Sequence, residues 1–365
     1  MASISEITNY LESLAPLSTQ ESYDNCGLIV GEPNTTVSGV LISLDCTEVV
    51  VEEAISLGCN LIISHHPIVF KGLKQLNGKN YVERTVIKAI KNDIALYAIH
   101  TNLDNYQYGV NFEIGSRLGL KNLKVLAPTK KKLLKYVVFC PREYAQQVSK
   151  AMFESGAGQI GDYSECSFET EGTGYFKPEE KANPFIGEKN KREKVEETKI
   201  EMISPLANKS AVITAMKAAH PYEEVAYDVY LLENENQFEG AGMVGELEES
   251  VAAPDFLNFV KKEFNCGVIR HTAVVKEKIQ RVAFCGGSGS FLIQSAKRNK
   301  ADIYLTGDLK YHEFFDAEDQ IILADIGHFE SEQFTPNLIY GILKKNFINF
   351  ALYLSKVKTN PLNYL

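Results

Sequence analysis

Short apolar runs alternate with amphipathic stretches in the first third of the chain. The runs cover residues 39–44, 61–64 and 94–99, and stretches with helical spacing separate them over residues 47–57 and about 81–92. Apolar runs that do not alternate with polar residues are typical of parallel strands buried on both faces. The pattern therefore predicts strands and helices in alternation.

The same pattern returns near the end of the chain. Apolar runs over residues 282–285, 303–305 and 321–324 are separated by helical stretches over residues 290–299 and about 311–317. Strands that alternate with helices indicate an α/β architecture with a parallel sheet. We therefore expect two related α/β halves, one from each end of the chain, that form one unit.

The middle of the chain has a different character. Residues 133–139 and 225–231 read as strands, residues 142–155 as a helix, and residues 172–198 are rich in glycine and charge. This mixture predicts an α+β domain with antiparallel pairing, inserted between the two halves. The expected division is 1–129 for the first part of the α/β unit, 130–245 for the insert and 246–365 for the second part.

Polar residues follow the predicted parallel strands where each strand ends. His65 and His66 end the second apolar run, Asp104 lies shortly after the third, and His328 with Glu332 follows the last. In open α/β sheets ligands bind beyond the carboxyl ends of the strands, so these five side chains should share one edge. His328 and Glu332 are four residues apart and would project from one helix face.

These residue types indicate a metal site. Imidazoles and carboxylates together suit first-row divalent metals, and a carboxylate can bridge two ions roughly 3.5–4 Å apart. A histidine taken alone is more often a hydrogen-bonded core residue or a solvated surface residue. The agreement of three separate segments favours the metal site. Its ions could be Zn, Fe, Mn, Co or Ni, because these ligands accept all of them.

Other polar residues leave alternatives open. His100 could orient a ligand or move a proton. His312, four residues after Asp308, could act with it as a ligand, acid or base near the metals. Asp308 could equally cap a helix while His312 faces solvent. The turn at residues 286–289 could bind an anion or be only a tight turn. His220, before Pro221, is more often structural than functional.

Composition narrows the partners and the compartment. The net charge of -9 over 365 residues argues against nucleic acid as a partner. No apolar stretch approaches the ~18 residues that span a bilayer, so no membrane is expected. The beginning of the chain lacks the pattern of a secretory signal, and the seven cysteines form no Cys-x-x-Cys pair, which predicts reduced thiols in the cytoplasm.

Several of these segments, in this order, resemble the YbgI/YqfO-like dinuclear-metal proteins, an NGG-interacting-factor-like family often labelled GTP cyclohydrolase I type 2 homologs. The matching segments cover residues 23–28, 63–67, 100–104, 305–308 with His312, and 327–332. The resemblance implies that His65, His66, Asp104, His328 and Glu332 bind two metal ions. One departure is Tyr23, where the family typically has tryptophan.

The resemblance also implies an architecture and an assembly. Residues 166–174, 183–187 and 220–224 look like the insert of the longer family members, which is similar in fold to the CutA and PII trimeric signalling proteins. Family members are expected to form a homohexameric ring with the metal sites facing an internal cavity.

The expected activity is metal-dependent hydrolysis. The family label points to attack on the purine ring of GTP, with His100 or His312 moving protons. A phosphoesterase with the same metal site is the nearest alternative. A second alternative is a non-catalytic regulatory or scaffold protein with a PII-like sensor insert, because a metal site alone does not establish turnover.

Overall fold

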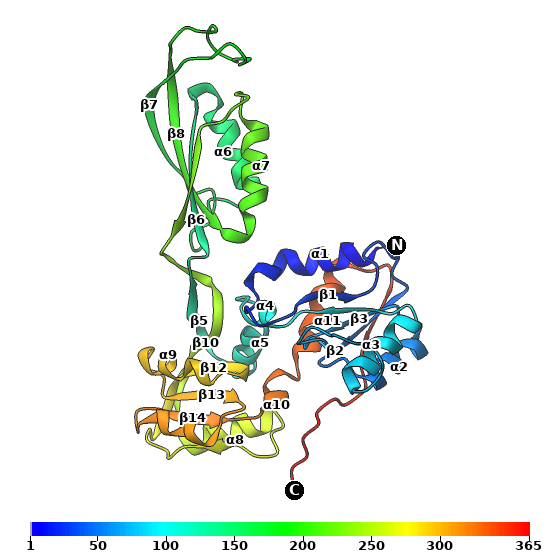
Figure 1. The fold of residues 1–365 in the computed structure, drawn as a ribbon. Coiled ribbons are helices and arrows are strands. Elements are labelled where there is room, and N and C mark those ends of the chain that lie inside the picture. Colours follow the sequence, from blue (N-terminus) through cyan, green and yellow to red (C-terminus); the bar gives the residue numbers. More distant parts are fainter. Residues whose placement is uncertain (1) are drawn as a thin grey trace. The chain divides into compact units, whose positions relative to one another are not determined.

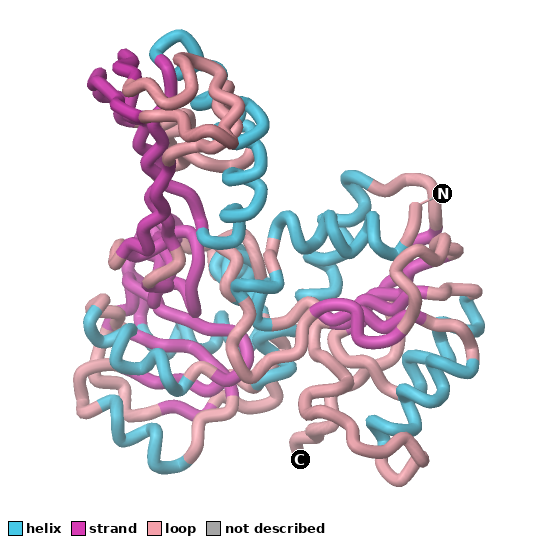
Figure 2. The backbone as a smooth tube through the Cα atoms, turned by 45° about the horizontal axis from the view of Figure 1, so that its top comes forward, coloured by secondary structure: helices cyan, strands magenta, loops and turns pink. Residues whose placement is uncertain are grey.

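The computed structural model describes residues 2–365, which form two compact units with a mixed α/β fold of several sheets (Figures 1 and 2). The residues up to Pro128 and Phe238–Leu365 make the larger unit, and Thr129–Gln237 make the smaller one. The sequence placed the second boundary after residue 245. Residues 238–245 belong to the larger unit because they lie in a long strand that joins one of its sheets.

The first sheet of the larger unit contains the three strands expected near the start of the chain. Its strand order is β1 (Gly27–Val30), β4 (Ala95–Ala98), β3 (Leu61–Ser64), β2 (Gly39–Ser43) and β15 (Ala351–Leu354). All neighbours pair in parallel except β1 with β4. The accompanying helices are α1 (Ile4–Leu14), η1 (Leu17–Thr19), α2 (Glu48–Leu57), α3 (Tyr81–Lys91), α4 (Thr101–Asp104) and α5 (Val110–Arg117).

The second sheet repeats the parallel core. Its strand order is β11 (Arg270–His271), β14 (Ile322–Asp325), β13 (Ile303–Gly307), β12 (Lys278–Ser288), β10 (Glu235–Ala252) and β5 (Lys121–Lys130). β12, β13 and β14 are parallel, and β10 and β11 pair antiparallel with them. Its helices are α8 (Ala253–Glu263), η4 (Ser290–Leu292), α9 (Ile293–Arg298), η5 (Tyr311–Ala317), α10 (His328–Glu332) and α11 (Thr335–Asn346).

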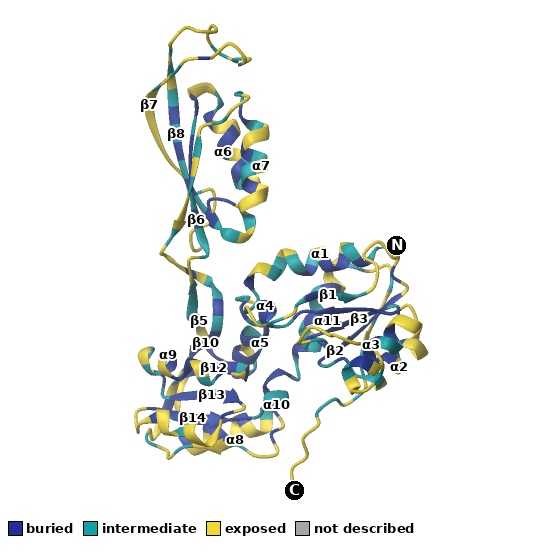
Figure 3. Cartoon of the chain, viewed as in Figure 1, coloured by how far each residue is buried: buried dark blue, intermediate teal, exposed yellow. Residues whose placement is uncertain are grey.

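Burial explains the unbroken apolar runs. Every residue of β2, β3, β4, β13 and β14 is buried (Figure 3). One hydrophobic core contains residues from both sheets, among them Ile42 and Phe284, so the two ends of the chain share a single interior. Of the helices that the structure describes, none has the length and apolar character needed to cross a membrane.

The smaller unit has its own sheet and core. Its elements are β6 (Leu133–Pro141), η2 (Arg142–Tyr144), α6 (Ala145–Glu154), β7 (Phe168–Phe176), β8 (Glu193–Pro205), η3 (Leu206–Asn208), α7 (Lys209–Ala219) and β9 (Tyr227–Leu232). The strand order β7-β8-β6-β9 with antiparallel pairing gives the βαββαβ arrangement of a ferredoxin-like fold. Val148, Met152 and Val212 pack from the helices onto one face of this sheet.

Candidate metal centre

His65 presents a free lone pair from a fully buried position. It follows β3 directly, and the side chain is 0% exposed. Its Nδ1 lies 2.8 Å from the carbonyl oxygen of Ile99. A carbonyl can only accept a hydrogen bond, so Nδ1 carries the hydrogen and Nε2 carries the lone pair. That tautomer prepares Nε2 to bind a cation.

The lone pair of His65 faces two carboxylates. Nε2 lies 3.6 Å from Oδ1 of Asp104 and 3.8 Å from Oε1 of Glu332. Neither His65 Nε2 nor Asp104 Oδ1 has a hydrogen-bond partner, although both atoms are buried. Buried polar atoms without partners are costly, and ligand atoms of one metal ion lie roughly 3–4 Å apart. The three side chains therefore fit a divalent cation.

A second group of potential ligands adjoins the first. Nε2 of His66 lies 3.0 Å from Oε2 of Glu332, and Nε2 of His328 lies 3.1 Å from the same oxygen. The two Nε2 atoms are 3.3 Å apart. Glu332 is 2% exposed and offers one carboxylate oxygen to each group, which is the arrangement expected of a carboxylate between two ions.

Two further carboxylates orient these imidazoles. Asp45, directly after Leu44 at the end of the first apolar run, has Oδ1 2.8 Å from Nδ1 of His66. Asp308 has Oδ2 2.6 Å from Nδ1 of His328. Such partners fix the ring orientation and direct Nε2 toward a metal. From the sequence, Asp308 is considered only together with His312, and neither aspartate is assigned this role. Asp308 caps no helix in the structure.

Carboxylates perturb the pKa values of the imidazoles and of Asp104 in this cluster. Burial lowers the pKa of His66, but its hydrogen bonds to the carboxylates of Asp45 and Glu332 outweigh this effect and raise the pKa to about 10. Burial likewise lowers the pKa of His328, and Glu332 and Asp308 raise it to about 11. Burial and the charge of Glu332 raise the pKa of Asp104 to about 7. The carboxylates of the cluster therefore favour positive charge at the positions of His66 and His328, as a cation site requires.

His100 lies beside the same cluster. Its ring centroid is 5.1 Å from that of His65 and 5.2 Å from that of His66, and these three histidines form a further group of potential ligands. Nδ1 of His100 lies 2.9 Å from Oδ1 of Asp24, and Oδ2 of Asp24 accepts from the backbone N–H of Thr101. Burial raises the pKa of Asp24, but the bonds from His100 and Thr101 outweigh it and hold it well below its usual value. In the sequence, Asp24 lies within the matching segment 23–28, where it received no role of its own.

His312 does not join the cluster. It is exposed, packs against Tyr311 and Phe315, and belongs to none of the groups of potential ligands found among residues 2–365. The expected α-helix around residues 311–317 is a 3₁₀ helix, η5, and Asp308 precedes it with a φ of 56°. A spacing of four residues therefore does not place Asp308 and His312 on one face.

The glycine-rich turn after β12 makes room for a ligand carboxylate. A Cβ on Gly287, whose φ is 62°, would lie 2.4 Å from Oε1 of Glu332 and 3.3 Å from Nε2 of His328. Gly287 donates its backbone N–H to Ser331 Oγ at 3.0 Å. The sequence left an anion cradle and a tight turn open for this segment. The structure places the chain's own Glu332 there.

The comparisons with known proteins cover nearly the whole chain. The family model described as Duf34/NIF3 (NGG1p interacting factor 3) matches residues 2–361. A protein of Halalkalibacterium halodurans named GTP cyclohydrolase 1 type 2 homolog is 40% identical over 364 residues, 98% of each chain. One of the same name from Bacillus subtilis is 38% identical over 366 residues, 99% of this chain and 98% of the relative.

Solved structures agree with these relatives. A Bacillus cereus protein related to NIF3 superposes with a TM-score of 0.87 at 40% identity, covering 100% of this chain and 99% of the other. A Staphylococcus aureus protein gives a TM-score of 0.78 at 32% identity, with the same coverage. The resemblance stated from the sequence motifs is thus confirmed, and the chain belongs to the Duf34/NIF3 family.

Proposed function

We propose that this protein binds two divalent metal ions and uses them to hydrolyse a substrate that contains a purine ring. His65, His66, Asp104, His328 and Glu332 would hold the ions. The names of the curated relatives, which refer to GTP cyclohydrolase, point to a purine ring that loses C8 as formate.

One observation carries the metal site. The unpartnered, buried Nε2 of His65 and Oδ1 of Asp104 face each other together with Glu332, and no neighbouring donor satisfies them. A fold gains nothing from directing a lone pair at two carboxylates. The arrangement is explained if the site evolved to accept cations. Mixed nitrogen and oxygen ligands leave Zn, Fe, Mn, Co and Ni as candidates.

The surrounding residues have roles in this proposal. When bound, divalent ions at such a site supply Lewis acidity and lower the pKa of water toward neutrality. Asp45 and Asp308 keep His66 and His328 oriented. Asp24 fixes the His100 ring through Nδ1, which leaves Nε2 of His100 to accept or donate a proton beside the substrate.

The cavities around the cluster favour a ring over a polyphosphate. One, of about 640 Å³, includes His66, His100 and His328, and a second, of about 190 Å³, includes Asp104 and Glu332. Both share Phe70, whose ring stacks against exposed Tyr23 with centroids 6.4 Å apart. No lysine or arginine lines either cavity. Stacking would hold a base, while a triphosphate lacks cationic partners in these linings.

Elemental analysis and a turnover assay test the proposal. Purified protein should contain about two divalent ions per chain, and His65→Ala and Glu332→Ala should each lose them. Metal-loaded protein should release formate from GTP, and from guanosine at a comparable rate. His271→Ala is the matched control, because His271 is exposed and its Nδ1 contacts only the carbonyl of Thr272. Absence of metal in the unaltered protein would refute the site.

Phosphoester hydrolysis is the alternative on the same metals, and generic phosphoesters in the same assay distinguish it. If metal binds but neither substrate class reacts above the His65→Ala background, the site serves a regulatory or scaffold role instead.

The smaller unit supports that regulatory alternative. We propose that it is an insert of CutA/PII type that senses a ligand or directs assembly, because it has its own core and a βαββαβ order. The family resemblance further suggests a homohexamer. Light scattering of the intact chain and of a chain without Thr129–Gln237 tests both points. A monomeric intact chain would refute the hexamer, and unchanged assembly after deletion would refute an assembly role for the insert.

A further inference from the structure

The smaller unit contains an aromatic pocket of about 340 Å³ that the metal chemistry does not use. Phe139, Gly174 and Glu197 line it from the strands, and the segments around Phe185 and Tyr222 complete it. Adjacent residues of a strand point to opposite faces of a sheet. Thr198 lines a groove on the α6 side, so Glu197 and this pocket lie on the face away from that helix.

Three aromatic rings form the walls. The centroid of Tyr222 lies 5.8 Å from that of Phe176, with the planes inclined by 62°, and 6.4 Å from that of Phe185, with an inclination of 53°. Such inclined contacts are a preferred arrangement of aromatic pairs, and all three rings line the same pocket. Tyr175, also in the lining, already has the Arg192 guanidinium 5.1 Å from its ring centroid.

A carboxylate without a cationic partner lies among these rings. Tyr222 donates its hydroxyl to Oε1 of Glu197 at 3.4 Å, and no lysine or arginine within residues 2–365 forms an ion pair with Glu197. Burial raises the pKa of Glu197. A Cβ on Gly174 would lie 2.1 Å from Oε2, so the carboxylate rests directly over this glycine. The negative charges of Glu223 and Glu224 add to the lining.

His220 holds the Tyr222 segment in place. It is 7% exposed, its Nε2 donates to the carbonyl oxygen of Phe139 at 3.0 Å, and its Nδ1 accepts the backbone N–H of Tyr222 at 3.0 Å. Both ring nitrogens are therefore used inside the fold, which agrees with the structural role that the sequence favoured. The aromatic ring of Tyr222, which His220 positions, lines the pocket and can contact a ligand.

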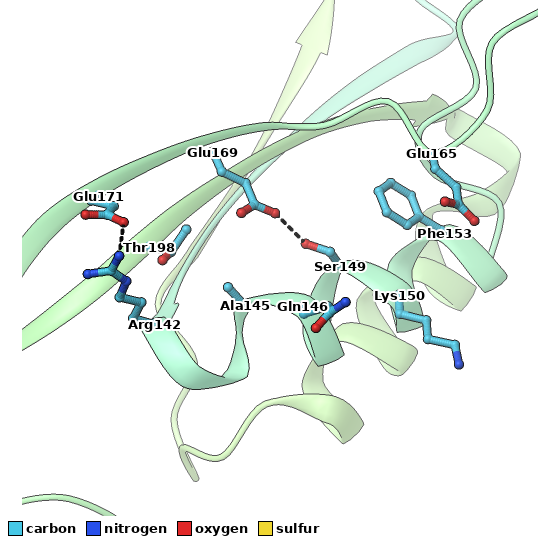
Figure 4. Close-up of a pocket in the computed structure, with 10 residues that line it drawn as sticks. All are labelled: Arg142, Ala145, Gln146, Ser149, Lys150, Phe153, Glu165, Glu169, Glu171 and Thr198. Atoms are coloured by element: carbon cyan, nitrogen blue, oxygen red, sulfur yellow. Dashed lines mark hydrogen bonds and ion pairs between the residues drawn. The ribbon is translucent and has the colours of Figure 1, made fainter.

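The groove on the α6 side is a useful contrast (Figure 4). Two polar pairs in its lining satisfy each other, since Arg142 pairs with Glu171 at 2.7 Å and Ser149 donates to Glu169 at 3.1 Å. Phe153 is the one aromatic residue of its lining, so it offers no aromatic cluster. The aromatic pocket and the groove on the α6 side therefore suit different classes of ligand.

We propose that the pocket formed by Phe176, Phe185, Tyr222 and Glu197 binds a small organic ammonium ion. Aromatic faces attract alkylated ammonium groups, and a carboxylate among the rings supplies the opposite charge. The volume admits a head group of choline size and excludes large cofactors. This site is independent of the metal chemistry of the larger unit.

Calorimetric titration of the full chain with choline tests the proposal at constant ionic strength. The matched ligand is 3,3-dimethylbutan-1-ol, which has the same shape without the charge. Choline should saturate a single site at low millimolar concentration and bind at least about tenfold more tightly than the alcohol. Glu197→Gln and Phe185→Leu should each weaken choline binding about fivefold or more. Phe185 is half exposed on a loop, so this variant should fold.

Glu171→Gln is the control variant. It removes the same charge from the same unit, but Glu171 pairs with Arg142 in the opposite groove, so choline affinity should stay unchanged. Three results would overturn the proposal: no saturation by about 50 mM choline, equal binding of the alcohol, or equal weakening by Glu171→Gln and Glu197→Gln.

Discussion

Replacing Gly287 by alanine should weaken metal binding strongly without replacing any of the proposed ligands. The new Cβ would lie 2.4 Å from Oε1 of Glu332, and real Cβ contacts below 3.0 Å essentially do not occur. The carboxylate must therefore retreat by about 1 Å to reach an ordinary contact distance. Glu332 faces both groups of potential ligands, so one displacement disturbs both.

The expected magnitudes follow from backbone strain and ligand displacement. Gly287 has a φ of 62°, and alanine in this left-handed region costs about 1–2 kcal/mol of stability. Binding constellations tolerate displacements of roughly 0.5 Å, so a shift of about 1 Å should weaken metal binding at least as much as removing an orienting residue, about 10- to 100-fold. Stability of the metal-free protein should fall modestly, and metal affinity should fall much more.

Gly58→Ala separates these two effects. Gly58 ends α2 with a φ of 69°, and a Cβ there meets nothing within 4 Å. It carries the same backbone strain with no effect on the site. Thermal unfolding should shift down by about 2–4 °C per kcal/mol for both metal-free variants, while elemental analysis and competition with a chelator should show metal loss only for Gly287→Ala. Full metal affinity in Gly287→Ala would refute the role assigned to Glu332.

Three further outcomes are expected. His312→Ala should keep its metal content and change stability by less than about 0.5 kcal/mol, because His312 is exposed; metal loss on elemental analysis would place it at the site after all. Burial lowers the pKa of His220 below its usual value, so its contribution to the stability of the smaller unit should be complete above the unfolded pKa of about 6.5 and be lost as the pH falls below it. The difference between the denaturation midpoints at pH 7.5 and pH 5 should therefore be smaller in His220→Gln than in the unaltered protein. Iodoacetamide should alkylate partly exposed Cys166 before Cys46, because burial raises the pKa of Cys46 to about 12; peptide mass spectrometry that finds Cys46 modified first would contradict this.

The sequence could predict which candidate ligands lie close together, because the carboxyl ends of parallel strands lie at the same edge of a sheet. His65 follows a strand whose neighbours are set by the alternation of strands and helices, and the structure brings it beside Asp104 and Glu332. That inference needs only strand direction and order. Whether the five side chains hold metal in solution stays a prediction, and the experiments above test it.

The sequence could not predict the orienting contacts. Asp45 reaches His66 across 21 residues, and Asp24 reaches His100 across 76, so both contacts depend on side-chain directions in the assembled fold. The spacing of Asp308 and His312 could not decide between the two readings for another reason. An interval of four residues brings side chains to one face at 3.6 residues per turn, whereas η5 is a 3₁₀ helix. Local periodicity is weakest where short helices follow strands, and the site lies at such junctions.

Prediction of the fold from the sequence was also limited at the edges of the sheets. Strand β15 completes the first sheet with residues 351–354, although the rest of that sheet comes from residues before 100. Only tertiary packing decides that the end of the chain returns there. The glycine- and charge-rich stretch 172–198 likewise contains parts of β7 and β8, because antiparallel strands with one exposed face tolerate many polar residues.

The cost of the site is itself an argument for its function. The buried Oδ1 of Asp104 lies beside buried Glu332, and desolvation with like charge raises the pKa of Asp104 to about 7. Replacing such groups by apolar residues of similar volume is often neutral or stabilising, so folding alone gives no reason to keep them. Three orienting carboxylates, Asp24, Asp45 and Asp308, add further charge around the histidines. Divalent cations would neutralise this cluster and satisfy the unpartnered atoms of His65 and Asp104 together. A site that is costly when empty and satisfied when loaded should stabilise the larger unit in proportion to metal concentration.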